Sequence, residues 1–470
     1  ADTNLKVGDR IVKINEIDVK SKSEISDILN KLNTGDKISI TVVNDDVISE
    51  KEAYIDNDKK IGIILCEVNE YNTKPKIEIK TDSNESGSSG GLITALSIYN
   101  SLIKEDITKG LKIVGTGTID KEGNVLANTP IWMDTRAQSI CDRLNQEIGQ
   151  EEIFEVAGNS LQPSYSTAKI LWYKENLPEV YAKIHKILQS NSYIAFKLTG
   201  AITQDVSQGY GLHCFNMKKG CWDEKMCERL GIPMEFLPEI CDCDHVVGTV
   251  TGKAAAECGL VEGTPVVAGG LDAACGTLGA GVIHSGETQE QGGQAGGMSI
   301  CTEEYKADPR LILSYHVVPG KWLLQGGTTG GGGVMRWFEH EFADYERMMK
   351  EQTGVSSLDQ LNKIAEKVAP GCDGMVFLPY MSGERSPIWN PYAKGVFYGL
   401  DFAKTKGHMV RACMEGVALS LRHNLEVAKE AGAEADVLRA MGGSANSLLW
   451  TQIKSDITGK PIIVPASDTA

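Results

Sequence analysis

Apolar and polar residues are spaced along the chain in ways that predict both strands and helices. Near the N-terminus the pattern predicts strands over Arg10–Ile14 and Lys37–Val43, with a helix over Ser23–Leu32 between them. Gly35-Asp36 marks a turn just before the second strand. Much further along, apolar residues recur at helical spacing over Arg411–Leu425, which predicts an amphipathic and mainly structural helix.

A short apolar run, Val266 to Ala268, leads into Gly269-Gly270-Leu271-Asp272. The run is too short and too β-branched for a helix, and paired glycines at a strand end let backbone or ligand approach closely. This placement predicts that Asp272 is a catalytic carboxylate. The alternative is that Asp272 only caps a helix over Ala273–Ala280.

The amino-acid composition and net charge of the chain limit the kinds of molecule that it is expected to bind. The chain has 470 residues, 41% of them hydrophobic, which is enough for several domains with substantial cores. A formal net charge of -16 without acidic tails argues against nucleic acid or an anionic membrane as the main partner. Apolar runs are far shorter than a membrane span. We therefore expect a small metabolite as partner and a cytoplasmic protein, and we expect Ala1, which has no preceding Met or signal segment, to be a cut end.

Twelve cysteines at irregular spacings predict reduced thiols rather than a disulfide framework. Cys241, Cys243 and His245 form the densest group of metal-ligand residue types. Further cysteines lie nearby in sequence: Cys214, Cys221 and Cys227. Their spacings fit no common zinc pattern, so we predict no metal site built from cysteine or histidine.

The stretch LKVGDRIVKINEIDVKSKSEISDILNKLNTGDKISITV resembles the later part of a PDZ domain, and we assign residues 1–56 to a partial domain of that kind. In that family an earlier strand and loop accept a peptide C-terminus by strand addition. Those elements would precede Ala1.

The next stretch, ESGSSGGLITALSIYNSLIKEDITKGLKIVGTGTIDKEGNV, contains a small-residue turn that opens an apolar helix. A flexible turn followed by a helix cap explains it, and so does a serine exposed at a helix N-terminus. The segment is similar to the proteolytic domain of Lon-type Ser-Lys peptidases over residues 57–125, with Ser89 at the nucleophile position. No lysine occurs between Lys121 and Lys169, so the resemblance implies a vestigial nucleophile without its base.

The family that the sequence resembles changes after Asp120–Val125. This change predicts a junction there and an apparent chimera. From about residue 120 to Ala470 the chain resembles the FGGY carbohydrate kinases, most closely the xylulokinase-like branch. The family's W-x-D-x-R motif falls on Trp132, Asp134 and Arg136, which implies a place near the sugar. A structural Asp-Arg pair under a core tryptophan is the alternative.

The same resemblance implies roles for several other residues. VVGTVTGKAAAECGLVEGTPVVAGGLDAACGTLGAG puts Asp272 at the general-base position, and FLPYMSGERSPIWNPYAKGVFYGL contains a family hallmark whose Glu384 and Arg385 are expected to brace the two lobes. Two glycine-rich turns and the segment MGGSANSLLWTQIKSDITGKPI are expected to bind the nucleotide. The implied contacts are Gly293, Gln294, Gly296, Gly332, Gly442, Gly443, Ala445 and Asn446, with Gln294 replacing the family's usual threonine.

The fold implied is α/β, with two actin-like ATPase (ribonuclease H-like) domains at residues 126–282 and 283–470 that hinge over ATP, Mg2+ and a sugar. The N-terminal segment would be α+β. The family's first strands, with an Asp that organises Mg2+, and its last helix would lie outside this chain. The function implied is ATP-dependent phosphorylation of a ketose such as xylulose. A Ser-Lys peptidase and a catalytically inactive composite chain are the alternatives, and a homodimer is an open alternative to a monomer.

Overall fold

The computed structural model describes residues 5, 10–19, 22–44, 47–55, 61, 117–119, 121, 124–127, 130 and 134–464. The chain divides into two compact units, Ala1–Lys80 and Thr81–Ala470. Each unit has its own buried apolar core, so each can be described by itself.

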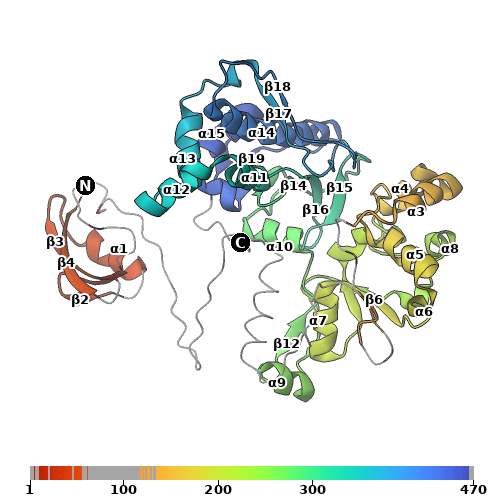
Figure 1. The fold of residues 1–470 in the computed structure, drawn as a ribbon. Coiled ribbons are helices and arrows are strands. Elements are labelled where there is room, and N and C mark those ends of the chain that lie inside the picture. Colours follow the sequence, from red (N-terminus) through yellow and green to blue (C-terminus); the bar gives the residue numbers. More distant parts are fainter. Residues whose placement is uncertain are drawn as a thin grey trace. The chain divides into compact units, whose positions relative to one another are not determined.

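The first unit is an antiparallel sheet with one helix, drawn in red in Figure 1. The sheet has four strands in the order β2-β1-β3-β4. The elements are β1 (Arg10–Ile14), β2 (Ile17–Asp18), α1 (Lys22–Asn30), β3 (Lys37–Asn44) and β4 (Val47–Tyr54). Ile14, Ile40 and Val42 from the sheet and Leu29 from the helix are buried together. The strands and helix predicted for this region are confirmed to within two residues.

The first half of the second unit consists of helices and short strands, and residues between Ala137 and Leu237 form an apolar core within it. Its helices are α3 (Gln138–Leu144), α4 (Gln150–Ala157), α5 (Ser166–Asn176), α6 (Pro178–Tyr181), α7 (Ser190–Thr199), α8 (Glu224–Leu230), α9 (Gly252–Cys258) and α10 (Asp272–Gly279). A 3-10 helix, η2 (Val206–Gly211), follows the strand β7.

The described strands of this half pair only in twos. They are β5 (Gly117–Ile119) with β6 (Lys186–Leu188), β7 (Thr203–Asp205) with β10 (Glu239–Cys241), β8 (Phe215–Asn216) with β9 (Cys221–Trp222), and β11 (Val246–Thr249) with β12 (Pro265–Val267). Since β5 precedes Asp120, the β5–β6 pair joins residues from both sides of the junction expected at Asp120–Val125.

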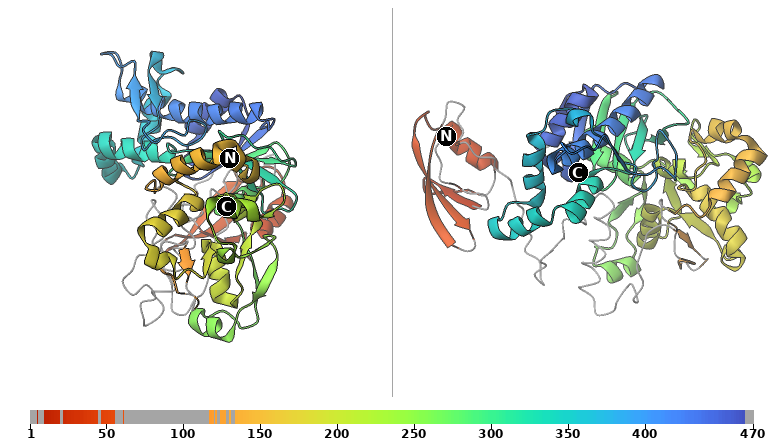
Figure 2. Two further views of the ribbon diagram at one scale, coloured as in Figure 1. Left: turned by 90° about the vertical axis from the view of Figure 1, so that its right-hand side faces the viewer. Right: turned by 45° about the horizontal axis from the view of Figure 1, so that its top comes forward.

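The second half contains a mixed sheet of six strands in the order β15-β16-β14-β13-β19-β20. These strands are β13 (Glu287–Gly292), β14 (Gly296–Thr302), β15 (Ile312–Tyr315), β16 (Trp322–Thr328), β19 (Val437–Met441) and β20 (Ile462–Ile463). Strand β13 is parallel to β19, and β14 is antiparallel to both β13 and β16. Hence β13, β16 and β19 all run in the same direction, and their carboxyl ends share one edge of the sheet (Figures 1 and 2).

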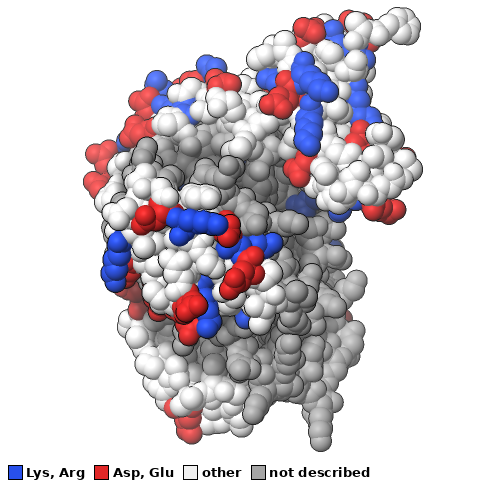
Figure 3. All heavy atoms as spheres, turned by 90° about the vertical axis from the view of Figure 1, so that its left-hand side faces the viewer, with Lys and Arg blue, Asp and Glu red and all other residues white. Residues whose placement is uncertain are grey.

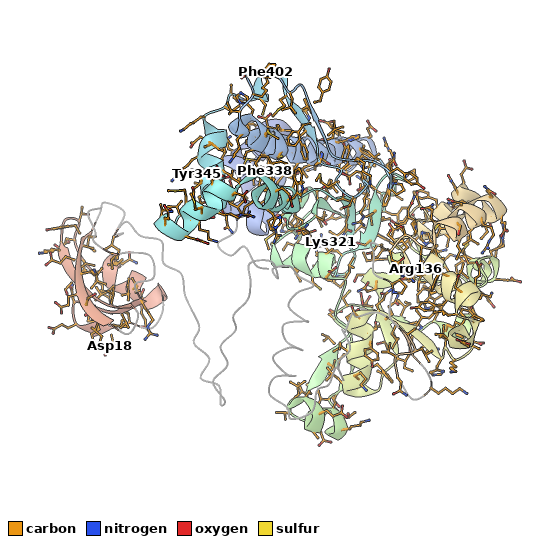
Figure 4. The ribbon with its side chains drawn as sticks, viewed as in Figure 1. Asp18, Arg136, Lys321, Phe338, Tyr345 and Phe402 are labelled. Atoms are coloured by element: carbon orange, nitrogen blue, oxygen red, sulfur yellow. The ribbon has the colours of Figure 1, made fainter. Side chains whose placement is uncertain are left out.

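Helices lie beside this sheet, and a further antiparallel strand pair lies at the top of Figure 1. The helices are α11 (Gly332–Phe342), α12 (Asp344–Thr353), α13 (Ser357–Glu366), α14 (Lys406–Glu430) and α15 (Leu448–Thr458), and the strand pair is β17 (Val376–Leu378) with β18 (Val396–Tyr398). The amphipathic helix predicted over Arg411–Leu425 is confirmed as the middle of α14. Phe338 of α11, labelled in Figure 4, is fully buried among α13, α14 and α15.

Charged side chains of both signs are interspersed on the face drawn in Figure 3. No helix among the described residues is long and apolar enough to cross a membrane. Within the same residues, no group of three or more His, Cys, Asp and Glu side chains is arranged to hold a metal ion. Cys241 and Cys243 instead direct their thiols at the Gln204 carbonyl and the Asp205 carboxylate, each over 3.7 Å.

Candidate active site

Asp272 stands at the start of α10, directly after a glycine turn that leaves β12. Gly269 has φ +77°, a left-handed conformation that glycine adopts without strain. A Cβ on Gly270 would lie 2.4 Å from Cγ1 of Val317, so no side chain fits there. The glycine pair is therefore required by the backbone path.

The Asp272 side chain is exposed, and its Oδ1 accepts a hydrogen bond from the Ala273 N–H over 2.7 Å. Leu271, not Asp272, occupies the N-cap position of α10. Helix capping alone thus does not account for the acidic residue, which is the first residue inside the helix. An anionic side chain there is favoured by the helix dipole and stays open to a ligand.

Tyr210 lies close enough to Asp272 and to Arg385, which come from two other segments, to interact electrostatically with both. Burial, followed by the Asp272 carboxylate, raises the pKa of Tyr210 to about 12, while Arg385 acts in the opposite direction. The Tyr210 ring packs edge to face against Tyr165, with centroids 5.8 Å apart. Tyr165 and Tyr210 come from the first half and Arg385 from the second, so both halves contribute to this place.

Three glycine turns meet at the shared edge of the large sheet. The turn between β13 and β14 is joined to the start of α11, because the Gly332 N–H donates to the Gly293 carbonyl over 2.7 Å. The next amide, of Gly333, donates to the Gln294 carbonyl over 3.0 Å. A Cβ on Gly332 would lie 2.7 Å from the Gly293 oxygen, which explains the glycine.

The third turn follows β19. Gly442 has φ +86°, and a Cβ there would lie 3.0 Å from the Gly292 carbonyl. The Ala445 N–H donates to the Gly442 carbonyl over 3.0 Å, which starts the 3-10 helix η5 (Gly443–Asn446). Gly443 and Asn446 are exposed, but Ala445 is 3% exposed and can offer little side-chain surface to a ligand.

A buried ion pair lies under these turns. Nζ of Lys454, on α15, is 2.7 Å from Oε1 of Glu290 on β13, and it donates to Oγ of Ser444 over 2.8 Å. The side chains of Lys454 and Glu290 are 2% and 4% exposed. Gly292 is packed against the same group, since a Cβ on it would lie 3.2 Å from the Lys454 ammonium. The ion pair therefore ties the first and third turns together.

The segment around Glu384 holds the end of β16. Oε1 of Glu384 accepts hydrogen bonds from the Thr329 N–H over 2.9 Å and from the Arg385 N–H over 2.7 Å. The Gly327 N–H donates to Oγ of Ser386 over 2.6 Å. Glu384 thus supports the turn between β16 and α11, and Arg385 lies beside Gly327, whose Cβ would be 3.1 Å from the guanidinium.

The residues predicted near the sugar form a local arrangement before α3. Oδ1 of Asp134 accepts from the Arg136 N–H over 3.1 Å and from Nε over 2.9 Å. The Arg136 guanidinium lies 4.8 Å from the ring centroid of Trp172, near α5 (Figure 4). Trp132 lies outside the described residues, as does Ser89. Arg136 thus contacts Trp172, which the sequence analysis did not connect to the motif.

Comparison with known proteins explains this arrangement. Residues 98–279 match the N-terminal domain of the FGGY family of carbohydrate kinases, and residues 296–470 match the C-terminal domain. The chain is 30% identical to the xylulose kinase of Bacillus subtilis (strain 168) over 351 residues, which are 74% of this chain and 68% of that protein. The chain belongs to the FGGY family of carbohydrate kinases. It is also 31% identical to the gluconokinase of Bacillus licheniformis over 352 residues, with the same shares covered.

Solved structures of FGGY kinases have the same fold. The xylulose kinase from Rhodospirillum rubrum matches with a TM-score of 0.68 and 25% identity, covering 91% of this chain and 84% of that one. The gluconate kinase from Lactobacillus acidophilus matches with a TM-score of 0.69 and 22% identity, covering 93% and 85%. The protein is thus a two-domain, actin-like carbohydrate kinase that phosphorylates a sugar with ATP.

The family match begins at residue 98, upstream of the kinase boundary expected at residue 126. The resemblances of residues 1–56 to a PDZ domain and of 57–125 to a peptidase stay predictions. The sequence analysis overlooked four residues near the site: Asp205, Ser207, Glu290 and Lys454. Asp205 and Ser207 could have been found from the sequence, because they form an Asp-x-Ser pair at the end of a strand. Lys454 could not, because its neighbours in the sequence are those of a helix residue exposed to solvent.

FGGY kinases use ATP as a substrate, generally with Mg2+. Backbone amides in glycine turns at the carboxyl ends of parallel strands fit a nucleotide phosphate chain.

Proposed function

We propose that this FGGY kinase phosphorylates a hydroxyl of a xylulose-like ketose, with Asp272 as general base. The observation that carries the proposal is the exposed Asp272 carboxylate on a glycine turn whose path excludes any other residue at Gly270. Xylulose kinases among the relatives support a ketose. The gluconokinase of similar identity makes a linear sugar acid the second candidate.

In the proposed reaction Asp272 accepts the proton of the attacking sugar hydroxyl. A bond forms between that oxygen and the γ-phosphorus of ATP, the bond from this phosphorus to the β-γ bridging oxygen breaks, and ADP leaves. Phosphoryl transfer depends mainly on positioning and charge stabilisation, to which a base typically adds a factor of about 100 to 10,000. A tyrosine phenol is protonated at neutral pH, so Tyr210, whose pKa the Asp272 carboxylate helps to raise, adds no charge beside Asp272.

The nucleotide is assigned to the three glycine turns. Gly293, Gln294, Gly296 and Gly332 would face the phosphates. Gly442, Gly443 and Asn446 would face the adenosine, with Ala445 acting through its backbone because its side chain is buried. The sugar is assigned to the side of Trp132, Asp134 and Arg136, where the Asp134–Arg136 ion pair would fix the guanidinium.

Sugar-dependent ADP release is the decisive assay, run with xylulose, ribulose and gluconate in parallel. Replacing Asp272 with Asn keeps the size and removes the basic oxygen, so kcat should fall about 100- to 10,000-fold with little change in the KM for ATP. Asp359→Asn, an exposed position on α13, is the matched control and should behave as wild type. Near-normal turnover of Asp272→Asn would refute the assignment, and turnover with gluconate alone would favour the second candidate.

The N-terminal residues are assigned by resemblance only, as a partial PDZ-like domain (1–56) and a partial peptidase-like segment (57–125). Labelling of Ser89 by a serine-directed acylating probe would revive the peptidase alternative. No sugar-dependent ADP release with any of the three sugars would favour the inactive composite. Light scattering of the purified chain would decide between the proposed homodimer and a monomer.

A further inference from the structure

A second pair of residues lies behind the turn that carries Asp272. Oγ of Ser207, in η2, accepts a hydrogen bond from the Leu271 N–H over 2.8 Å. The same hydroxyl donates to Oδ1 of Asp205 at the end of β7. Ser207 and Asp205 are both fully buried, and Leu271 is the residue immediately before Asp272.

Asp205 is held from several directions. Nδ2 of Asn191, on α7, donates to its Oδ2 over 2.7 Å, and the Gln208 N–H donates to Oδ1 over 3.2 Å. The Cys243 thiol reaches the same oxygen over 3.7 Å. A buried carboxylate with this many donors is rigid, because turning it would leave buried polar groups unpaired.

The same network reaches the turn at further points. Nδ2 of Asn191 also donates to the Ala268 carbonyl over 3.2 Å, and the Gly269 N–H donates to the Cys243 carbonyl over 3.0 Å. Gly270 lies next to the same group, since a Cβ on it would be 3.4 Å from Oγ of Ser207. Hydrogen bonds thus hold the turn at Ala268, at Gly269 and at Leu271.

We propose that Ser207, oriented by Asp205, is a positioning residue that sets the place of the Asp272 carboxylate through the Leu271 amide. This inference rests on the proposed role of Asp272. Catalysis by a base requires its oxygen within hydrogen-bond reach of the substrate hydroxyl. A displacement of the catalytic oxygen by about 1 Å can lower the rate about 100-fold. The buried Ser207 hydroxyl holds the amide of Leu271, the residue immediately before Asp272.

The test compares Ser207→Ala with Ser192→Ala in the full chain. Ser192, on α7, is also a buried serine, 3% exposed, and its hydroxyl has no hydrogen-bond partner. Ser207→Ala should lower kcat about 10- to 100-fold and leave the KM for ATP unchanged, whereas Ser192→Ala should match wild type. If Ser207→Ala fails to fold, Ser207→Cys takes its place in the test. Its thiol is close in size to the hydroxyl but is a weaker acceptor, so this variant should also lose turnover.

A double-variant cycle separates positioning from general loosening. If Ser207 acts through the Asp272 carboxylate, Ser207→Ala should not lower further the residual turnover of Asp272→Asn. Equal losses in both backgrounds, or a kcat for Ser207→Ala within twofold of Ser192→Ala, would overturn the inference. Normal turnover of Asp272→Asn would instead refute the proposed function.

A measurement without turnover completes the test. Amide exchange of the Leu271 N–H should accelerate at least tenfold in Ser207→Ala and not in Ser192→Ala, because only the first loses the acceptor. Unchanged exchange would overturn the inference whether or not the chain is active.

Discussion

Replacement of Lys454 by Met removes a buried charge from beneath the nucleotide turns. The variant deletes a 2.7 Å contact to Glu290 and a 2.8 Å contact to Ser444. Hydrogen bonds to charged groups contribute about 1.5–3 kcal/mol each, so their loss amounts to about 3–6 kcal/mol. This agrees with the cost of about 3–5 kcal/mol for leaving one member of a buried ion pair without its partner.

Neutralising both partners should be much milder. Glu290→Gln combined with Lys454→Met leaves no buried charge, and uncharged replacements of buried pairs are often nearly neutral. Because Glu290 precedes the first turn and Ser444 lies in the third, we also expect the KM for ATP to rise in the single Lys454 variant.

Local stability can be measured by amide hydrogen exchange in β13 and α15, which reports opening free energies segment by segment. Lys253→Met on α9 is the control, because the Lys253–Glu257 pair is 4.0 Å apart with side chains 81% and 55% exposed. The reasoning fails if Lys454→Met changes the opening free energy by less than about 1 kcal/mol, or if the double variant is as unstable as the single one.

Three further predictions concern single residues. Gly442→Ala should raise the KM for ATP about tenfold, because φ +86° with ψ 176° is a conformation almost confined to glycine that costs another residue about 1–3 kcal/mol, and the Cβ would press on the Gly292 carbonyl. Gly459→Ala, with φ +67° and open space, is the control. His213 is held neutral by burial, which lowers its pKa from 6.5 to about 4, so the unfolded state binds the proton first and the chain loses about 3 kcal/mol as pH falls from 6.5 to 4. In denaturant unfolding across this range, the loss should be about 3 kcal/mol smaller in His213→Gln than in wild type, because only the contribution of His213 is removed. Ser89 should resist serine-directed acylation, and labelling that disappears in Ser89→Ala would contradict this.

Local features of the site were predictable because they depend on residues that are close together in the sequence. The turn from β12 to α10 needs a left-handed residue and a residue without Cβ, and the sequence supplies Gly269-Gly270 in that order. The apolar run Val266 to Ala268, and the helix over Ala273–Ala280 that the alternative interpretation of Asp272 assumed, lie within one residue of the observed bounds of β12 and α10. Strand β3 was predictable for the same reason, since its buried residues Ile38, Ile40 and Val42 alternate with less buried ones.

Contacts between distant segments were not predictable in this way. The guanidinium of Arg136 lies over Trp172 of α5, a residue outside the motif that contains Arg136. Lys454 and Glu290 are 164 residues apart, and the sequence around each of them does not indicate that they form an ion pair. The Leu271 amide and the Ser207 hydroxyl are 64 residues apart and meet only because η2 packs behind the turn.

The sequence by itself determined which segments turn, which are helical or extended, and that one carboxylate follows a glycine pair. Those properties depend on backbone sterics and on the spacing of apolar residues within a few positions. The tertiary structure decided which glycine turns meet. Strands β13, β16 and β19 run in the same direction in one sheet, which brings Gly293, Gly332 and Gly442 to one edge and puts the Lys454 ammonium beneath them. Strand order and buried charge pairing arise from packing the whole chain, so residues that form the site are joined only once the sheet is complete.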